Sequence, residues 1–411
     1  MPTKPLVPPP MARDAAAVWA GDAYVSDIER RLSPYFERSE PRRRAMAYLR
    51  GLLSPAERKN TWQLAEVSGD PTPYAFQHLL RRSLWDPEAV RDELRRYVIQ
   101  QLGDTNAVLV IDETGFPKKG RHSAGVARQY SATASKVENC QIGIFLGYAS
   151  RLGHTLLDRE LYLPEEWTAD RPRCQHAGIP ADRAFASKPA LAKQILQRTL
   201  GAGMPARWVT GDRGYGDDRR LRLWLEAQPQ AHVLAVSGHE SVWVDGRQRP
   251  VEAILAALPV EDWIRLSAGK GATAPLWYDW RWLPLDKPPE PDWCRWLLVQ
   301  QSVSGPPALQ AYVIFAPHET PLVEAVRVVE NCGTIAQLFD AANAEVGLDH
   351  YEVRSWTGWY RHITLAMWAL ALLTVLQAKG ISKETIQKSW PSRQSGSSLL
   401  AFKSRQGLGF A

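Results

Sequence analysis

The chain contains little cysteine: there are four residues in 411, and they lie far apart without a paired spacing. This pattern disfavours both a zinc site and a disulfide framework, and it fits a reducing cytoplasm. Long apolar runs are also missing. The longest, residues 363–376, is interrupted by Thr364 and Thr374 and falls short of the ~18 residues that span a bilayer. We therefore expect a cytoplasmic protein without a membrane partner.

The two ends of the chain differ in composition from the rest. The first residues, MPTKPLVPPPMARD, lack the apolar core of a secretion signal, so residues 1–20 are expected to form a disordered lead-in. Residues 381–411 contain scattered glycine and serine and are expected to form a polar, partly disordered tail. The folded part is therefore expected to lie between these two segments.

The net charge of the chain is +6, and its pI is near 9.1. A mild basic excess suits a polyanionic partner, although many soluble proteins are equally basic. The sequence also has 17 tryptophans, most of which are expected in the core, while a few could stack on unpaired bases.

Residues 21–104 have apolar residues at helical spacing and predict a helical domain, a candidate for binding DNA. Within it, residues 59–82 predict a helix, a glycine-containing turn and a second helix that ends in basic residues. Two interpretations stay open with equal weight: a helix-turn-helix that reads DNA, and a plain αα-hairpin packed in a helical domain.

Strand patterns begin near residue 105 and alternate with helical ones, which predicts an α/β fold with a mixed sheet. We expect a core in two parts, residues 105–237 and residues 319–380, separated by a β-rich insertion at residues 238–318. The expected core strands are residues 107–112, 141–150, 155–163, 208–211 and 232–237, and the clearest helices are 188–202, 219–227, 334–344 and 359–378.

Two aspartates end predicted strands. Asp112 closes the apolar run AVLVID, and Asp212 follows the strand in WVTGDRGYG. Carboxylates at the ends of neighbouring strands can hold Mg²⁺ or Mn²⁺, which prefer hard oxygen ligands. Two such ions about 4 Å apart can activate an attacking oxygen and stabilise the leaving one in phosphodiester chemistry. Strand-terminal aspartates are common, however, so the spacing alone is a modest signal.

Four longer motifs carry a resemblance to a known family. The segment VIDETGFPKKGRHSAGVARQYSATASKVENCQIG (residues 110–143) closely resembles the first-aspartate block of insertion-sequence 701 transposases. LYLPEEW (residues 161–167) and WVTGDRGYGDD (residues 208–218) resemble their next two blocks, and GLDHYEVRSWTGWYRHITLAM (residues 347–367) resembles their C-terminal signature. The similarity covers roughly residues 34–379.

This resemblance implies an RNase H-like core with a β insertion, and DNA cleavage and strand transfer that depend on Mg²⁺. Asp112 and Asp212 would be the first two acids of the catalytic triad. The implied partners are DNA at the inverted terminal repeats, target DNA, and a second copy of the chain in a homodimer. The protein would then be associated with the nucleoid when bound to DNA.

The third acid is where the sequence departs from the family. The family pattern resembles Arg-Trp-x-Ile-Glu-Glu-x-Phe-x-x-Ala-Lys-x-Glu-x-Gly-Leu-Asp, whereas this chain has CGTIAQLFDAANAEVGLD (residues 332–349). In the ungapped register, Ala336 takes the place of the catalytic glutamate. Asp340, four residues later on the same helical face, could replace it, although its side chain starts about 6 Å further along the axis.

Further basic positions of the family pattern are also changed. Cys332 and Gly333 replace Arg-Trp, Asn343 replaces a lysine, and Gln300 and Gln301 stand where relatives tend to have two arginines. Several losses at functional positions indicate decay, domestication or deliberate inactivation.

The basic loop after the first aspartate contributes candidate DNA contacts, namely Lys118, Lys119 and Arg128, with Arg121 beside them; the alternative is a solvated loop. In the C-terminal signature, Tyr351 and Arg354 could bind the transposon strand. Arg361 and His362 could also bind the strand, or they could instead anchor a helix. Glu113 should point away from Asp112, because successive side chains of a strand point to opposite faces of the sheet.

Three hypotheses follow. The chain is an active or weakly active phosphoryl transferase, with Asp112, Asp212 and Asp340 in the site. Alternatively, it is a catalytically dead DNA-binding protein, either a relic or a domesticated repressor. The third hypothesis is a structural or interaction protein that keeps only the fold.

Overall fold

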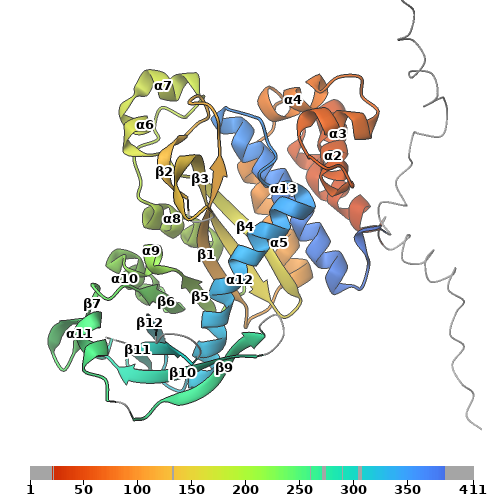
Figure 1. The fold of residues 1–411 in the computed structure, drawn as a ribbon. Coiled ribbons are helices and arrows are strands. Elements are labelled where there is room, and N and C mark those ends of the chain that lie inside the picture. The colour runs from red at the N-terminus through yellow and green to blue at the C-terminus, as the bar shows by residue number, and fades with distance from the viewer. Residues whose placement is uncertain are drawn as a thin grey trace, which may run out of the picture.

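The computed structural model describes residues 21, 23–131, 134–259, 261–270, 275–288, 290–303 and 308–384. The expected lead-in, residues 1–20, and nearly all of the expected polar tail lie outside these residues. The described chain is built around a mixed sheet with helices packed on it (Figure 1).

The centre of the sheet has the strand order β4-β3-β1-β5-β6. Strands β1 (Val108–Pro117), β3 (Lys136–Ser150) and β4 (Gly153–Leu161) are antiparallel neighbours, whereas β5 (Trp208–Gly211) and β6 (Ala231–Val236) run parallel to β1. β1 and β5 are buried along most of their length, as their apolar runs predict. This arrangement confirms the α/β, RNase H-like mixed sheet expected from the sequence.

The strands predicted as an insertion extend this same sheet. β12 pairs antiparallel with β6, and β11, β10 and β9 follow in order, so the sheet has ten strands on its main path and branch. Pairing with β12 satisfies the backbone N–H and C=O groups along the edge of β6 that faces away from β5. The strands and the helix of this region are β7 (Ser241–Val244), β8 (Arg247–Pro250), α11 (Val251–Ala256), β9 (Ile264–Lys270), β10 (Pro275–Pro284), β11 (Trp293–Ser302) and β12 (Leu309–Pro317). Outside this region, β2 (Ala127–Ser131) pairs antiparallel with β3.

The N-terminal region is helical, as expected. Asn60 caps α3 by accepting a hydrogen bond from the Gln63 backbone, and Gly69 ends the same helix in a left-handed conformation at φ 72°. α3 is followed by α4, which packs against α2 and against the C-terminal helix α13. The helices here are η1 (Ser33–Tyr35), α2 (Ser39–Leu53), α3 (Thr61–Ser68), α4 (Tyr74–Arg81) and α5 (Pro87–Leu102).

The other helices pack on the sheet. α12 contacts β1 and β5, α13 contacts β4, and α8 contacts β3 and β4 (Figure 1). α12 is longer than predicted, because the apolar spacing continues through the segment before residue 334. These helices are α6 (Glu165–Ala169), α7 (Arg171–His176), α8 (Lys188–Gly201), α9 (Arg213–Gly216), α10 (Arg219–Ala227), α12 (Leu322–Val346) and α13 (Trp356–Ala378).

Helix α13 forms the centre of the helical layer. Its 23 residues are long and apolar enough to cross a membrane by length and composition, but 89% of its most apolar window is buried inside the protein. It contacts α2, α4, α5 and β4, so its apolar character is explained by burial on several sides.

Candidate active site

Asp112 and Asp212 lie side by side on two neighbouring parallel strands. Asp112 is in the middle of β1, which continues to Pro117 instead of ending at the aspartate as predicted, whereas Asp212 directly follows β5. Ile111 of β1 is in register with Gly211 of β5, so the next residue along each chain is one of the aspartates. Neighbouring strands are about 4.8 Å apart, which brings the two carboxylates together. Asp112 is half-buried and Asp212 is exposed, so the pair is open to solvent on one side.

Local backbone groups orient both carboxylates. Oδ1 of Asp112 accepts a hydrogen bond of 2.7 Å from the Glu113 backbone, and Oδ1 of Asp212 accepts one of 2.9 Å from the Gly214 backbone. Asp212 is also the N-cap of the short helix α9. The motif DRGYG therefore fixes the second aspartate through its own chain turn.

The positive groups near Asp112 and Asp212 do not fully offset the negative charge of the two carboxylates. Burial, together with the charge of Asp212, raises the pKa of Asp112 to about 7. Partial burial, followed by the charge of Glu113, raises the pKa of Asp212. Carboxylates in this state gain from a nearby cation, since a positive charge between them favours their ionised forms.

A third carboxylate, that of Glu113, lies beside the pair. Its Oε1 accepts a hydrogen bond from Lys188 at the start of α8, and its Oε2 accepts one of 2.7 Å from the Tyr215 hydroxyl. Glu113 thus faces α8, which agrees with the expected alternation along β1. The contacts of Glu113 with Lys188 and Tyr215 were not predicted, because these residues are 75 and 102 positions away from it in the chain.

Helix α12 packs on β1 and β5, the two strands that carry the aspartate pair. The Cys332 thiol is held near Thr210, and burial together with the charges of Asp112 and Asp212 raises its pKa to about 12. Ala336 lies one helical turn after Cys332 and is exposed. The helix therefore presents a thiol and a methyl group at the positions where the resemblance to insertion-sequence 701 transposases implies an arginine and a glutamate.

The structure does not bring Asp340 to the aspartate pair. Asp340 is exposed on α12, a further turn along the helix from Ala336. Among the described residues, no three His, Cys, Asp or Glu side chains are placed to hold a metal ion together. In the described residues, the carboxylates open to an ion at this point are therefore those of Asp112 and Asp212, since Glu113 is bonded to Lys188 and Tyr215. Two carboxylates still suit Mg²⁺, which is commonly bound by one or two carboxylates, substrate phosphate and water.

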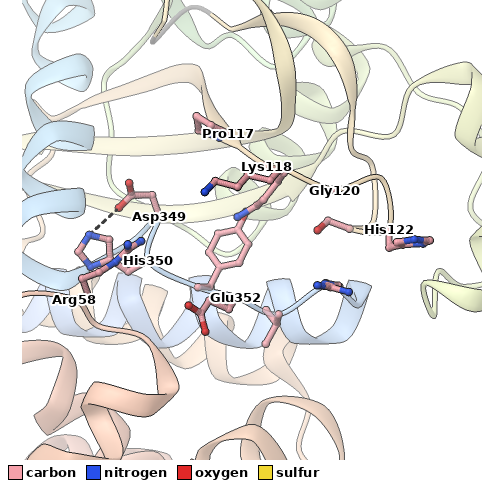
Figure 2. A pocket seen from close by; sticks show the side chains of 13 residues that line it. Arg58, Pro117, Lys118, Gly120, His122, Asp349, His350 and Glu352 are labelled. Carbon is pink, nitrogen blue, oxygen red and sulfur yellow. Dashed lines mark ion pairs between the residues drawn. The ribbon is translucent and has the colours of Figure 1, made fainter.

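Only some of the basic residues predicted to contact DNA lie close together in the structure. Lys118, Lys119 and Arg354 line one cleft of about 310 Å³, together with Arg58, which the sequence did not single out (Figure 2). Arg128 is exposed on β2 and does not line this cleft.

Tyr351 is in the core rather than on the surface. Its side chain is buried, and its hydroxyl donates a hydrogen bond of 2.9 Å to Oε1 of Gln141. Its ring packs against Phe116 and His362, and the residue also lines the cleft. Contact of Tyr351 with DNA stays a prediction.

Arg361 and His362 are anchors within the fold. Arg361 donates hydrogen bonds to the backbone oxygens of Ser83 and Trp85, at the start of the α4–α5 connection. His362 Nδ1 lies 2.8 Å from the Tyr48 hydroxyl, and its Nε2 lies 3.1 Å from the Gly347 oxygen. Of the two interpretations of these residues, the structural one accounts for their contacts.

A mixed sheet of this order, with one aspartate within β1 and another directly after the adjacent parallel strand β5, fits the class of DDE nucleases. A protein-family model described as DDE superfamily endonuclease matches residues 31–254, more than half of the chain. The chain belongs to this family. It is also 29% identical over 207 residues to a protein of Microchaete diplosiphon named "Probable transposase for insertion sequence element IS701". That match covers 50% of this chain and 51% of the relative, so the chain spans about half the length of the relative.

Proposed function

We propose that this chain is a transposase-class protein that binds DNA at inverted terminal repeats and derives from enzymes that cleave and transfer DNA strands. The observation that supports this most directly is the pairing of Asp112 and Asp212 on adjacent parallel strands. Its relative's name and its family point to the same class.

Asp112 and Asp212 would hold Mg²⁺ or Mn²⁺. When bound, such an ion would lower the pKa of an attacking oxygen and offset charge on the phosphate. Glu113, held by Lys188 and Tyr215, would keep the loop of Asp212 in place. The chain supplies no third carboxylate at Ala336, and the loss of such a ligand costs several kcal/mol of transition-state stabilisation as an order of magnitude. Strand cleavage is therefore proposed to be impaired.

A second candidate function is a DNA-binding protein without catalysis, a relic or a repressor. It is favoured by the exposed methyl group of Ala336 and by Cys332 beside the aspartates, since neither can ligate Mg²⁺. The third hypothesis, an interaction protein that binds no DNA, finds support in Gln300, which is buried and bonded to Tyr312 instead of presenting a charge. We further propose that the protein acts in the cytoplasm, at the nucleoid, and that it does so as a homodimer.

The decisive experiment is DNA cleavage with Mg²⁺ or Mn²⁺ on the DNA that flanks the coding region. The chain is compared with Ala336→Glu, with Asp112→Ala and with Asp340→Asn. We expect little cutting by the unaltered chain, more by Ala336→Glu, and no effect of Asp340→Asn. Cutting that Asp340→Asn abolishes would show a displaced third acid. DNA binding that survives Asp112→Ala, without cutting by any variant, would favour the binding protein.

A further inference from the structure

The cleft in Figure 2 gathers cationic side chains from three separate parts of the chain. Arg58 comes from the α2–α3 connection, Lys118 and Lys119 follow the end of β1, and Arg354 lies between α12 and α13. We propose that this cleft binds a backbone phosphate of DNA at a distance from the aspartate pair, and so holds the strand between the helical region and the sheet. This inference rests on the proposed DNA-binding function.

In the described residues, no carboxylate lies within ion-pair distance of the cleft's cations, although Asp349 and Glu352 act on Lys118 from further away. In the described part of the chain, Arg58, Lys118, Lys119 and Arg354 form no ion pair with an acidic side chain. Arginines elsewhere at the same interface between helices and sheet behave differently. Arg91, Arg95, Arg159 and Arg198 all pair with acids.

Two acids lie on the rim. Asp349 lies 3.7 Å from Nε2 of His350 (Figure 2), and burial lowers the pKa of that histidine. Glu352 accepts a hydrogen bond of 3.3 Å from Asn60. With four cations and two acids, the cleft has a formal charge of +2 with its histidines neutral, and this balance suits a phosphodiester.

Lys118 is the most constrained of the four cations. Its Nζ lies 3.6 Å from the centre of the Tyr351 ring, and burial lowers its pKa to about 8. The charges of Asp349 and Glu352 offset this effect of burial only in part, and a phosphate would add further counter-charge. The ring holds the ammonium at the floor of the cleft, where it needs little reorganisation to meet a ligand.

The walls of the cleft are tied to one another. The Ala124 backbone donates a hydrogen bond of 2.9 Å to the Arg354 oxygen, which joins the two loops. The Lys59 backbone donates one of 3.0 Å to Nδ1 of His350, which joins the helical region to the same connection. Because the backbone is fixed at these points, the cations are presented in a preformed arrangement.

The position of the cleft separates it from the aspartate pair. Lys118 follows Asp112 by six residues, which corresponds to at most about 20 Å of extended chain at about 3.3 Å per residue. DNA rises about 3.4 Å per base step, so a phosphate bound at the cleft would be a different one from a reactive phosphate at the aspartates.

The test is the salt dependence of DNA binding by the full chain, measured by fluorescence anisotropy on a labelled duplex. We compare Arg58→Ala and Arg354→Ala with Arg247→Ala, an exposed arginine on β8 outside the cleft. Each cleft variant should bind roughly 5–10-fold more weakly at low salt and lower the log–log salt slope by about one, whereas Arg247→Ala should change neither as much. Thermal unfolding verifies that all three fold, as expected for exposed side chains.

Glu352→Gln provides a change in the opposite direction. Removing a negative charge from the rim should tighten binding by roughly two- to five-fold. Phosphate-ethylation interference tests the same contact. Ethylation of one particular phosphate should weaken DNA binding by the unaltered chain, and it should have no such effect on binding by Arg354→Ala.

The outcomes separate this inference from the proposed function. If the unaltered chain binds DNA and both cleft variants bind as tightly as Arg247→Ala does, the cleft is not a phosphate site, but the DNA-binding function stands. If the unaltered chain does not bind DNA even at low salt, both are overturned. Competition by inorganic phosphate at millimolar concentration, without any effect of the variants on DNA binding, would identify a free-phosphate site instead.

Discussion

The hydroxyl of Tyr215 donates a hydrogen bond of 2.7 Å to Oε2 of Glu113. Tyr215 belongs to the turn after Asp212, and Glu113 directly follows Asp112 on β1. The contact therefore ties together the two chain segments that carry the aspartate pair. Tyr215 is completely buried, so this bond cannot be replaced by a bond to bulk water.

Tyr215→Phe is expected to lower the free energy of unfolding by about 1–3 kcal/mol, because it leaves a shielded carboxylate without one of its donors. Chemical denaturation measures this change. Tyr130→Phe is the matched control, since Tyr130 is 56% exposed and should lose almost nothing. Equal effects of the two substitutions would contradict the structural role given to Tyr215.

Divalent cations should stabilise the folded chain through the aspartate pair. Mn²⁺ at about 100 times its dissociation constant should add about 2.7 kcal/mol to the free energy of unfolding. Asp112→Asn and Asp212→Asn should abolish this gain, because each removes a charged ligand. Asp340→Asn should keep it, and Ala336→Glu should tighten the ion by roughly ten-fold by restoring a carboxylate. Thermal unfolding with and without Mn²⁺ gives the comparison, and an undiminished shift in Asp112→Asn would rule out the pair as the binding site.

Asp158 is expected to be essential for stability. It is fully buried on β4 and pairs with Arg91 and Arg95 of α5 and with Arg198 of α8, at 2.7–3.0 Å. Although burial alone would raise its pKa, the charges of Arg198 and Arg91 hold that pKa well below its usual range. Its stabilising effect is therefore present above the ordinary aspartate range, near pH 4, and is lost as the pH falls further.

Asp158→Asn should cost about 3–5 kcal/mol, because it leaves buried arginines without their counter-charge. Denaturation at pH 7 measures this. Asp92→Asn is the control: Asp92 contacts Arg91 and Arg95 too, but its side chain is 41% exposed, so the cost should stay below about 1 kcal/mol. A loss of similar size in both variants would argue against a special role of burial at Asp158.

His362 should make the fold sensitive to mild acid. Burial lowers the pKa of His362 to about 4 from an ordinary value near 6.5, since its ring is enclosed between Tyr48 and Gly347. The unfolded chain therefore takes up a proton before the folded one does. Stability is full above about pH 6.5 and falls as the pH drops toward 4.

The loss attributable to His362 between pH 7 and pH 5 should be about 2 kcal/mol, at about 1.36 kcal/mol per pH unit. His362→Gln removes the titrating group and should flatten this part of the pH profile, although it lowers stability at pH 7. His122→Gln is the control, because His122 is exposed and should leave the profile unchanged. An unaltered slope in His362→Gln would show that other groups cause the acid sensitivity.

The elements that local pattern determines were predictable. The apolar run before Asp112 and the one before Asp212 predict two buried strands, and the structure places these strands as parallel neighbours. The helices at residues 188–202 and 219–227 were predicted within one residue of α8 and α10. The joining of the β-rich insertion to β6 was not predicted, because strand pairing depends on which edges meet in three dimensions.

The sequence by itself determined the two apolar runs that form β1 and β5, the aspartates Asp112 and Asp212, and the alanine at position 336, since each is visible as residue type at a position in a local pattern. Only the tertiary structure decided the surroundings of these residues. It brought Lys188 and Tyr215 to Glu113, placed Cys332 beside the aspartates, buried Tyr351, and added Arg58 to the cleft. The physical reason is that these contacts join segments tens to hundreds of residues apart, and the packing of helices on the sheet, not spacing along the chain, sets their geometry.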